Sequence, residues 1–276
     1  MLLLKNNPGI NLVLILLTIT FLGCTEELDL DLNSSDPQVV VEANISSSEG
    51  TQVLLTSSVN FDDDNDFPVV TLADVTIEVS DGNTYNLPEM SPGRYEMESL
   101  ICEPSKSYDL EILTGSKLIT ARCVVPTQVP FDSLIVEKIE GETAGGPGGG
   151  FGNGTQYRIK VQYNDPAGQP NYYRFVVFKN GSFESSTIFD DRLSDGQVNT
   201  NTLLSFGTNL SSGDSIEVKM QCIDENVYDY YNSFGNLFGG PTNASTPANP
   251  YTNLIGTKLG YFSAHTSESK SQIIPN

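Results

Sequence analysis

The residues that could carry chemistry are mostly carboxylates, and their densest group lies in one short stretch. Asp62, Asp64 and Asp66 alternate there, and alternating carboxylate oxygens are ligands that Ca²⁺ prefers. An EF-hand loop would continue with Gly at position 67 and Glu at position 73, where this chain has Phe67 and Ala73. The stretch is therefore either a solvated acidic loop or a weak calcium site.

Catalytic sets are harder to assemble from this sequence. His265 is the single histidine, and no serine lies in a nucleophile-elbow sequence, so nothing indicates a Ser-His-Asp triad. One histidine and no CxxC pair also argue against a zinc site. A paired-carboxylate hydrolase stays open because 35 acidic residues always allow some pair, but the chain has no Trp to stack on sugars. We expect a protein without catalytic residues or cofactors.

The charge balance excludes whole classes of partner. The chain has 14 basic and 35 acidic residues, which gives a net charge of −21. A potential of that sign repels phosphate backbones, so nucleic acid is not an expected partner. It also argues against peripheral binding to anionic lipid head groups, so membrane attachment would depend on acyl groups.

The N-terminal segment predicts such an anchor. An apolar run from Ile10 to Leu22 is shorter than the roughly 20 residues that a membrane span needs, and it suits the h-region of a signal peptide. It ends in Phe21-Leu22-Gly23-Cys24, which resembles the bacterial lipobox, in which the Cys thiol is acylated and the chain is cut before it. We therefore expect a signal peptide at 1–23 and lipidation, with palmitate among the acyl groups, at Cys24. The alternatives are an ordinary signal peptide whose Cys24 joins a disulfide, or a retained helix.

Residues 24–35 predict an acidic tether between the anchor and the folded part. Glu26, Glu27 and Asp29 closely follow Cys24, and this arrangement resembles the signal that sends lipoproteins of Bacteroidota to the cell surface. A plain solvated linker explains the same residues. Both interpretations place the folded part outside the inner membrane, and we expect an outer-membrane, lipid-anchored protein that faces the cell surface.

The rest of the chain predicts a mainly β fold in two parts. In residues 36–127, Val75, Ile77 and Val79 alternate with polar residues, and Asp81-Gly82 is a hairpin turn. Short strands at this spacing are typical of an immunoglobulin-like or transthyretin-like sandwich. Residues 128–276 predict a second β-rich domain, with a Gly-rich flexible loop at 141–154 and a strand at 259–264 followed by a polar tail.

One short aromatic helix is expected in this second part. Asp224 is a plausible N-cap, and the aromatic and apolar residues that follow it recur at helical spacing up to Phe238. An aromatic stripe of this kind favours packing against the core over a ligand platform. The polar and aromatic residues 234–251 are where we expect a partner contact.

Two kinds of covalent modification are candidates. A disulfide between Cys102 and Cys123 is possible in an oxidising compartment, although a hairpin that turns near Gly115 would place Cys123 opposite Ser107. Cys222 would then remain unpaired. Asp132-Ser133-Leu134 and Asp214-Ser215-Ile216 resemble the sequon for O-glycosylation in Bacteroidota, which makes Ser133 and Ser215 candidate acceptors.

Several stretches in order resemble one family of Bacteroidota outer-membrane lipoproteins, catalogued as a domain of unknown function and commonly encoded beside TonB-dependent receptors. They span nearly the whole mature chain. The stretches are the lipobox with its acidic followers, Val39–Ala43, Ala73–Ile77, Gly93–Tyr95, Asp165–Arg174, Ser212–Asp214, Val227–Tyr231 and Leu259–Phe262. The resemblance implies no catalytic residues, because the family has no established activity.

We therefore expect a non-catalytic accessory or ligand-binding subunit of a TonB-dependent nutrient uptake system, with the receptor as its partner. The uptake role rests on the resemblance. The alternatives are a surface hydrolase that acts on polysaccharide or peptide, and a structural component of the cell envelope.

Overall fold

The structure is a computed structural model, and it describes residues 36–60, 66–139, 156–203, 210–238 and 249–275. Within these ranges the chain is mainly β, as the sequence predicts. The elements are β1 (Val39–Ser46), β2 (Gly50–Ser57), β3 (Asp74–Val79), β4 (Thr84–Leu87), β5 (Glu89–Ser91), β6 (Arg94–Met97), β7 (Ser107–Thr114), β8 (Lys117–Val124), β9 (Phe131–Ile139), β10 (Gln156–Asn164), β11 (Tyr172–Lys179), β12 (Ser182–Asp190), β13 (Val198–Leu203), β14 (Ser215–Ile223), α2 (Glu225–Phe238) and β15 (Leu259–Ile273).

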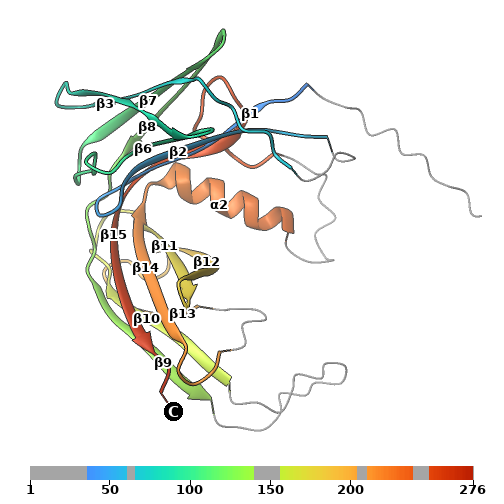
Figure 1. Cartoon of the computed structure of the whole chain (residues 1–276). Helices are drawn as coiled ribbons and strands as arrows, with labels where there is room; N and C mark the ends of the chain where they lie inside the picture. Colours follow the sequence, from blue (N-terminus) through green and yellow to red (C-terminus); the bar gives the residue numbers. More distant parts are fainter. Residues whose placement is uncertain (1–35, 61–65, 140–155, 204–209, 239–248, 276) are drawn as a thin grey trace, which may run out of the picture. The chain divides into compact units, whose positions relative to one another are not determined.

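These strands form three sheets (Figure 1). An eight-stranded sheet has the order β12-β11-β14-β15-β1-β2-β6-β5, a four-stranded sheet the order β4-β3-β7-β8, and a three-stranded sheet the order β13-β10-β9. Neighbouring strands that follow closely in sequence pair antiparallel through short turns, as at β3 and β4 or β7 and β8. The pairing of β1 with β15 is parallel and joins the two ends of the folded chain.

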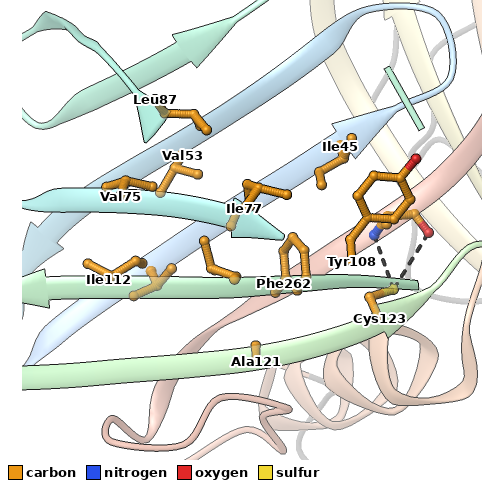
Figure 2. Packing of buried hydrophobic residues seen from close by; sticks show 14 of the residues in the cluster. Ile45, Val53, Val75, Ile77, Leu87, Tyr108, Ile112, Ala121, Cys123 and Phe262 are labelled. Atoms are coloured by element: carbon orange, nitrogen blue, oxygen red, sulfur yellow. Dashed lines mark hydrogen bonds between the residues drawn. The ribbon is translucent and has the colours of Figure 1, made fainter. Parts of the chain in front are cut away.

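Each smaller sheet buries a hydrophobic core against the same face of the eight-stranded sheet. One core gathers residues of β1, β2, β3, β7 and β8 around Phe262 and Ala264 of β15 (Figure 2). The other gathers residues of β9, β10, β11, β13 and β14. Successive residues of a strand point to opposite faces, so Glu268 lies on the same face of β15 as Phe262, and it accepts a hydrogen bond from the Phe131 amide of β9.

The boundary that the sequence suggests between residues 127 and 128 falls between the strands of the two smaller sheets, but the eight-stranded sheet contains strands from both sides of it. Residues 36–276 form one compact unit, because β15 pairs with β1 on one side and β14 on the other. The C-terminal strand thus completes the N-terminal core, and it makes the eight-stranded sheet continuous across the expected boundary.

Strand β15 is longer than the sequence predicts. We expected a strand at 259–264 followed by a polar tail, but the strand continues to Ile273 and pairs with β14 from Thr266 to Ile273. Polar side chains do not prevent this pairing, because backbone hydrogen bonds hold the ladder. At its start, Gly260 has φ 104° and lies against Val41, whose carbonyl oxygen would be 1.9 Å from an added Cβ. Only glycine fits there.

The predicted helix is present as α2 and begins after its predicted N-cap. The Asp224 carboxylate accepts a hydrogen bond from the Val227 amide at 2.9 Å, which satisfies one of the free N–H groups of the first turn. Tyr230 and Tyr231 lie against Tyr261 of β15, with ring centroids 4.7 and 5.3 Å away. Because Tyr261 and Phe262 point to opposite faces, α2 covers the face of the large sheet that lies away from the two cores.

Candidate functional site

A groove of about 420 Å³ lies on the α2-covered face of the eight-stranded sheet. This volume is within the range of small-molecule sites. Its floor is formed by outward-pointing side chains of three neighbouring strands. These are Arg174 and Val176 of β11, Gln221 of β14, and Tyr261 and His265 of β15. The sheet positions these side chains together although they lie far apart in the sequence.

A chain of hydrogen bonds crosses three strands on this floor. Arg174 Nη1 donates to Gln221 Oε1 at 3.0 Å, so the amide nitrogen of Gln221 faces His265 Nε2 at 2.9 Å. An amide nitrogen can only donate, and His265 Nε2 must therefore accept. The proton of the neutral imidazole then lies on Nδ1, which is 3.0 Å from Ser263 Oγ.

Burial keeps His265 neutral. The side chain is 3% exposed, and burial lowers the pKa of its imidazole to about 3, with smaller contributions from the positive charges of Arg174 and Lys219. Both ring nitrogens are engaged in hydrogen bonds. His265 thus serves as a fixed hydrogen-bonding group and is not placed to act as a general base.

Arg174 is the charged group that this arrangement holds in place. Its Nε donates to Ser186 Oγ at 2.9 Å, and its guanidinium carbon lies 4.3 Å from the ring centroid of Tyr231, a cation–π contact. Among the described residues, no carboxylate lies within ion-pair distance of Arg174. The groove therefore contains an ordered cation that has no counter-ion among the described residues.

The other end of the groove is different in charge. Lys219 forms an ion pair with Glu49 and lies 5.0 Å from the ring centroid of Phe178. Phe178 in turn contacts Phe183 edge to face, with centroids 6.3 Å apart, and Phe183 is 62% exposed. This end is aromatic and close to neutral, because the Lys219 charge is matched by a carboxylate.

A larger groove of about 760 Å³ lies over β3, β7 and β8 beside residues 251–255. Its lining includes Glu78, Asp109 and Glu111, and its cation Arg122 is 3.3 Å from a carboxylate oxygen of Asp109. In a chain of net charge −21, an acidic surface with a paired arginine is ordinary. We therefore regard the smaller groove around Arg174 as the better candidate site.

A carboxylate cluster lies elsewhere, at the loops around β11. Asp165, Asp191 and Asp195 each bring an oxygen within 4.8 Å of the others, and these oxygens could hold a cation. Burial, together with the negative charges of the other two carboxylates, raises the pKa of Asp191. Nothing in the sequence joins Asp165 to Asp191 and Asp195, because strands β11 and β12 lie between them along the chain.

Protein donors already surround this cluster. Asp165 accepts hydrogen bonds from the Tyr173 hydroxyl and from the Gly196 amide. Asp191 accepts from the Asn171 amide at 2.8 Å, and Asp195 accepts from a backbone amide of the 166–169 turn at 2.8 Å. These bonds tie the loop before β11 to the loop after β12, so the cluster has a structural role whether or not an ion binds.

The disulfide suggested by the sequence is not formed. Cys102, Cys123 and Cys222 are free and buried, and burial raises the pKa of all three thiols, that of Cys102 to about 12. The hairpin register is also one residue from our expectation, because Cys123 lies opposite Tyr108 and Ser107 lies opposite Val124.

The remaining predicted site residues fall in different places. Cys24, Asp62 and Asp64 lie outside the described residues, as do the Gly-rich stretch and residues 239–248 of the expected partner contact. Asp66 is exposed. The two candidate glycosylation sites lie on different strands. Ser133 is half-buried in β9, and Ser215 is exposed as the first residue of β14.

Sequence reasoning missed the groove itself. One signal was present, because Arg174 is a charged residue within the nearly continuous apolar run of β11. A charge at such a position must point to the polar face of the sheet or find a partner. The other groove residues resemble ordinary outward-facing strand residues.

Comparison with protein families gives one match that covers the folded chain. The model of a domain of unknown function, DUF4249, matches residues 25–271. The chain belongs to this family. Membership agrees with the resemblance to a family of unknown function that the sequence carries. The description of DUF4249 names no activity. No curated protein matches the chain.

Solved structures that resemble this DUF4249 chain include the interferon gamma receptor α chain of chicken, at 9% identity and a TM-score of 0.23, over 88% of this chain and 100% of that one. A TM-score this low carries no conclusion about fold or function. No helix among the described residues has the length and apolar character needed to cross a bilayer.

Proposed function

We propose that this protein is a lipid-anchored, surface-exposed outer-membrane protein that captures or presents a ligand for a TonB-dependent nutrient receptor. Its origin in Bacteroidota is part of the proposal. The lipobox ending at Cys24 and the acidic residues after it support the anchor and the surface location. The observation that carries the binding role is the groove in which Arg174 is ordered and no carboxylate of the part of the chain that the structure describes pairs with it.

The same groove supports binding over catalysis. A ligand site needs a shaped cavity with a few placed polar groups, and Arg174 is held by Ser186, Gln221 and the Tyr231 ring. A hydrolytic site would also need a nucleophile or a general base within reach of the substrate. The imidazole in this groove is neutral, and both of its nitrogens are hydrogen-bonded.

The experiment that tests the proposal is co-purification from outer membranes in mild detergent. A tag at the C-terminus is placed on the native protein, on Cys24→Ala and on Thr25→Ala, a matched control next to the anchor. We expect a TonB-dependent receptor to co-purify with the native protein and with Thr25→Ala. Cys24→Ala should leave the membrane fraction and lose the receptor.

Three outcomes would change the proposal. A native protein that comes down alone from the outer membrane removes the uptake role. An envelope-assembly protein in place of a receptor favours the structural alternative. Membrane attachment that survives Cys24→Ala contradicts the lipid anchor.

A further inference from the structure

We propose that the groove binds a small organic monoanion, with its carboxylate on Arg174 and its apolar part directed along β11 toward Phe178 and Phe183. This inference rests on the proposed function, since it names the ligand class of the same site. It is carried by the contrast between the two ends of the groove. At one end the Arg174 guanidinium has no carboxylate partner among the described residues. At the other end Phe178 and Phe183 lie beside Lys219, whose charge is matched by Glu49.

The guanidinium suits a carboxylate. Arginine presents donors in a planar fork that matches the two oxygens of a carboxylate. Of the donors of Arg174, Nε and Nη1 are used by Ser186 and Gln221, while Nη2 has no hydrogen bond to a described residue. The Tyr231 ring covers one face of the guanidinium. An anion would thus approach a donor group that is already oriented, which lowers the entropic cost of binding.

The spacing sets the length of the ligand. Arg174, Val176 and Phe178 are alternate residues of β11 and therefore point to the same face. Arg174 and Phe178 are about 13 Å apart along the strand, at about 3.3 Å per residue. A carboxylate on Arg174 would place a chain of a few carbons over Val176, which lines the groove, and a terminal apolar group against the edge-to-face ring pair.

The charges favour one carboxylate over two. Lys219 is matched by Glu49, so a second anionic group at the aromatic end would meet the Glu49 carboxylate. The whole chain has a net charge of −21, which disfavours non-specific anion binding. An anion that binds must therefore gain a specific contact, and Arg174 is the group that offers it.

The test uses phenylbutyrate as the probe, with its neutral amide phenylbutyramide and with acetate for comparison. Binding to the membrane-extracted protein is measured by ligand-observed NMR titration at fixed ionic strength. We expect saturable binding of phenylbutyrate, with the amide and acetate each about tenfold or more weaker. Arg174→Gln should weaken phenylbutyrate binding by about ten- to a hundredfold, the value of a charge-assisted hydrogen bond.

The matched control is Arg94→Gln, which removes the same charge from an exposed arginine that pairs with Glu96 on β6, outside the groove. It should leave binding unchanged. Phe183→Ala adds an independent variant on an exposed side chain, and it should weaken phenylbutyrate several-fold without affecting acetate. Thermal unfolding of each variant confirms that it is folded. If Arg174→Gln fails to fold, Phe183→Ala and the amide comparison still decide.

The inference is overturned if phenylbutyrate does not saturate, if the amide binds equally well, or if the two arginine variants lose affinity to the same extent. Its failure is distinct from that of the proposed function. A receptor that co-purifies while no probe binds leaves the uptake role standing and removes only the ligand class. If phenylbutyrate binds but no receptor co-purifies, the ligand class stands and the uptake role is removed.

Discussion

His265 should make the stability of this protein fall as the pH drops below neutral. The imidazole has a pKa of about 3 in the folded protein, against 6.5 for an unperturbed histidine. Between these values the unfolded chain binds a proton that the folded chain does not. The stability that the neutral imidazole contributes is therefore fully present above the unperturbed pKa of 6.5. It is lost as the pH falls toward about 3, where the loss levels off.

The magnitude follows from the same two values. A difference of one pKa unit corresponds to about 1.4 kcal/mol. A pH of about 5 lies about 1.5 units below the unperturbed pKa. The imidazole of the unfolded chain is therefore protonated there, while that of the folded chain is still neutral. The free energy of unfolding should therefore be lower by about 2 kcal/mol at about pH 5 than at about pH 7.5. Burial raises the pKa of the Asp191 and Asp224 carboxyls, which acts in the opposite direction, so the contribution of His265 is isolated by comparison with a variant that lacks the imidazole.

The assay is urea unfolding at several pH values, for the native chain and for His265→Gln. Glutamine keeps hydrogen-bonding groups at this position but does not titrate, so the comparison concerns the slope with pH and not the absolute stability. The native chain should lose about 2 kcal/mol over the range, and the variant should lose clearly less. Equal slopes would refute the reasoning. So would an imidazole NMR signal of the folded protein that titrates near its unperturbed pKa, and with one histidine in the chain that signal is unambiguous.

Three further predictions concern the fold. Gly260→Ala should prevent folding or severely destabilise the fold, because the new Cβ would meet the Val41 carbonyl. Gly115→Ala, whose Cβ would meet nothing within 4 Å, should lower the free energy of unfolding by about 1–2 kcal/mol from its positive φ alone. Urea unfolding compares the two variants. Phe262→Ala should cost about 3–5 kcal/mol because the ring is fully buried, and Phe183→Ala should cost less than about 1 kcal/mol. The three buried thiols should be unreactive toward a thiol reagent until the protein unfolds, and modification of the native protein at the rate of a free thiol would contradict their burial.

The strands were predictable because their signal is local. Alternation at Val75, Ile77 and Val79 specifies which side of β3 is buried, and the structure buries all three. The N-cap at Asp224 is equally local, since the side chain bonds an amide three residues later. Such features depend on neighbours in the sequence, and the pattern alone contains them.

The order of the sheet was not predictable in the same way. The parallel pairing of β1 with β15 joins residues such as Ala43 and Phe262, and nothing in either strand identifies the other. The one sequence trace of this pairing is Gly260, whose missing side chain makes room for the Val41 carbonyl. A lone glycine at a strand start has many explanations, so the sequence suggested two domains where the chain forms a shared sheet.

The groove illustrates why conspicuous residues were poor guides to the site. The acidic run at Asp62–Asp66 attracted attention because like residues lie together in the sequence, but a binding site needs unlike groups that lie together in space. Arg174 gains its interest from Gln221, which comes from another strand, and Gln221 is oriented by an imidazole from a third. A protonated His265 could no longer accept from Gln221, and it would add a positive charge near Arg174. The burial that keeps the imidazole neutral thus also keeps the guanidinium oriented, and the cost of that burial appears in the pH dependence of stability.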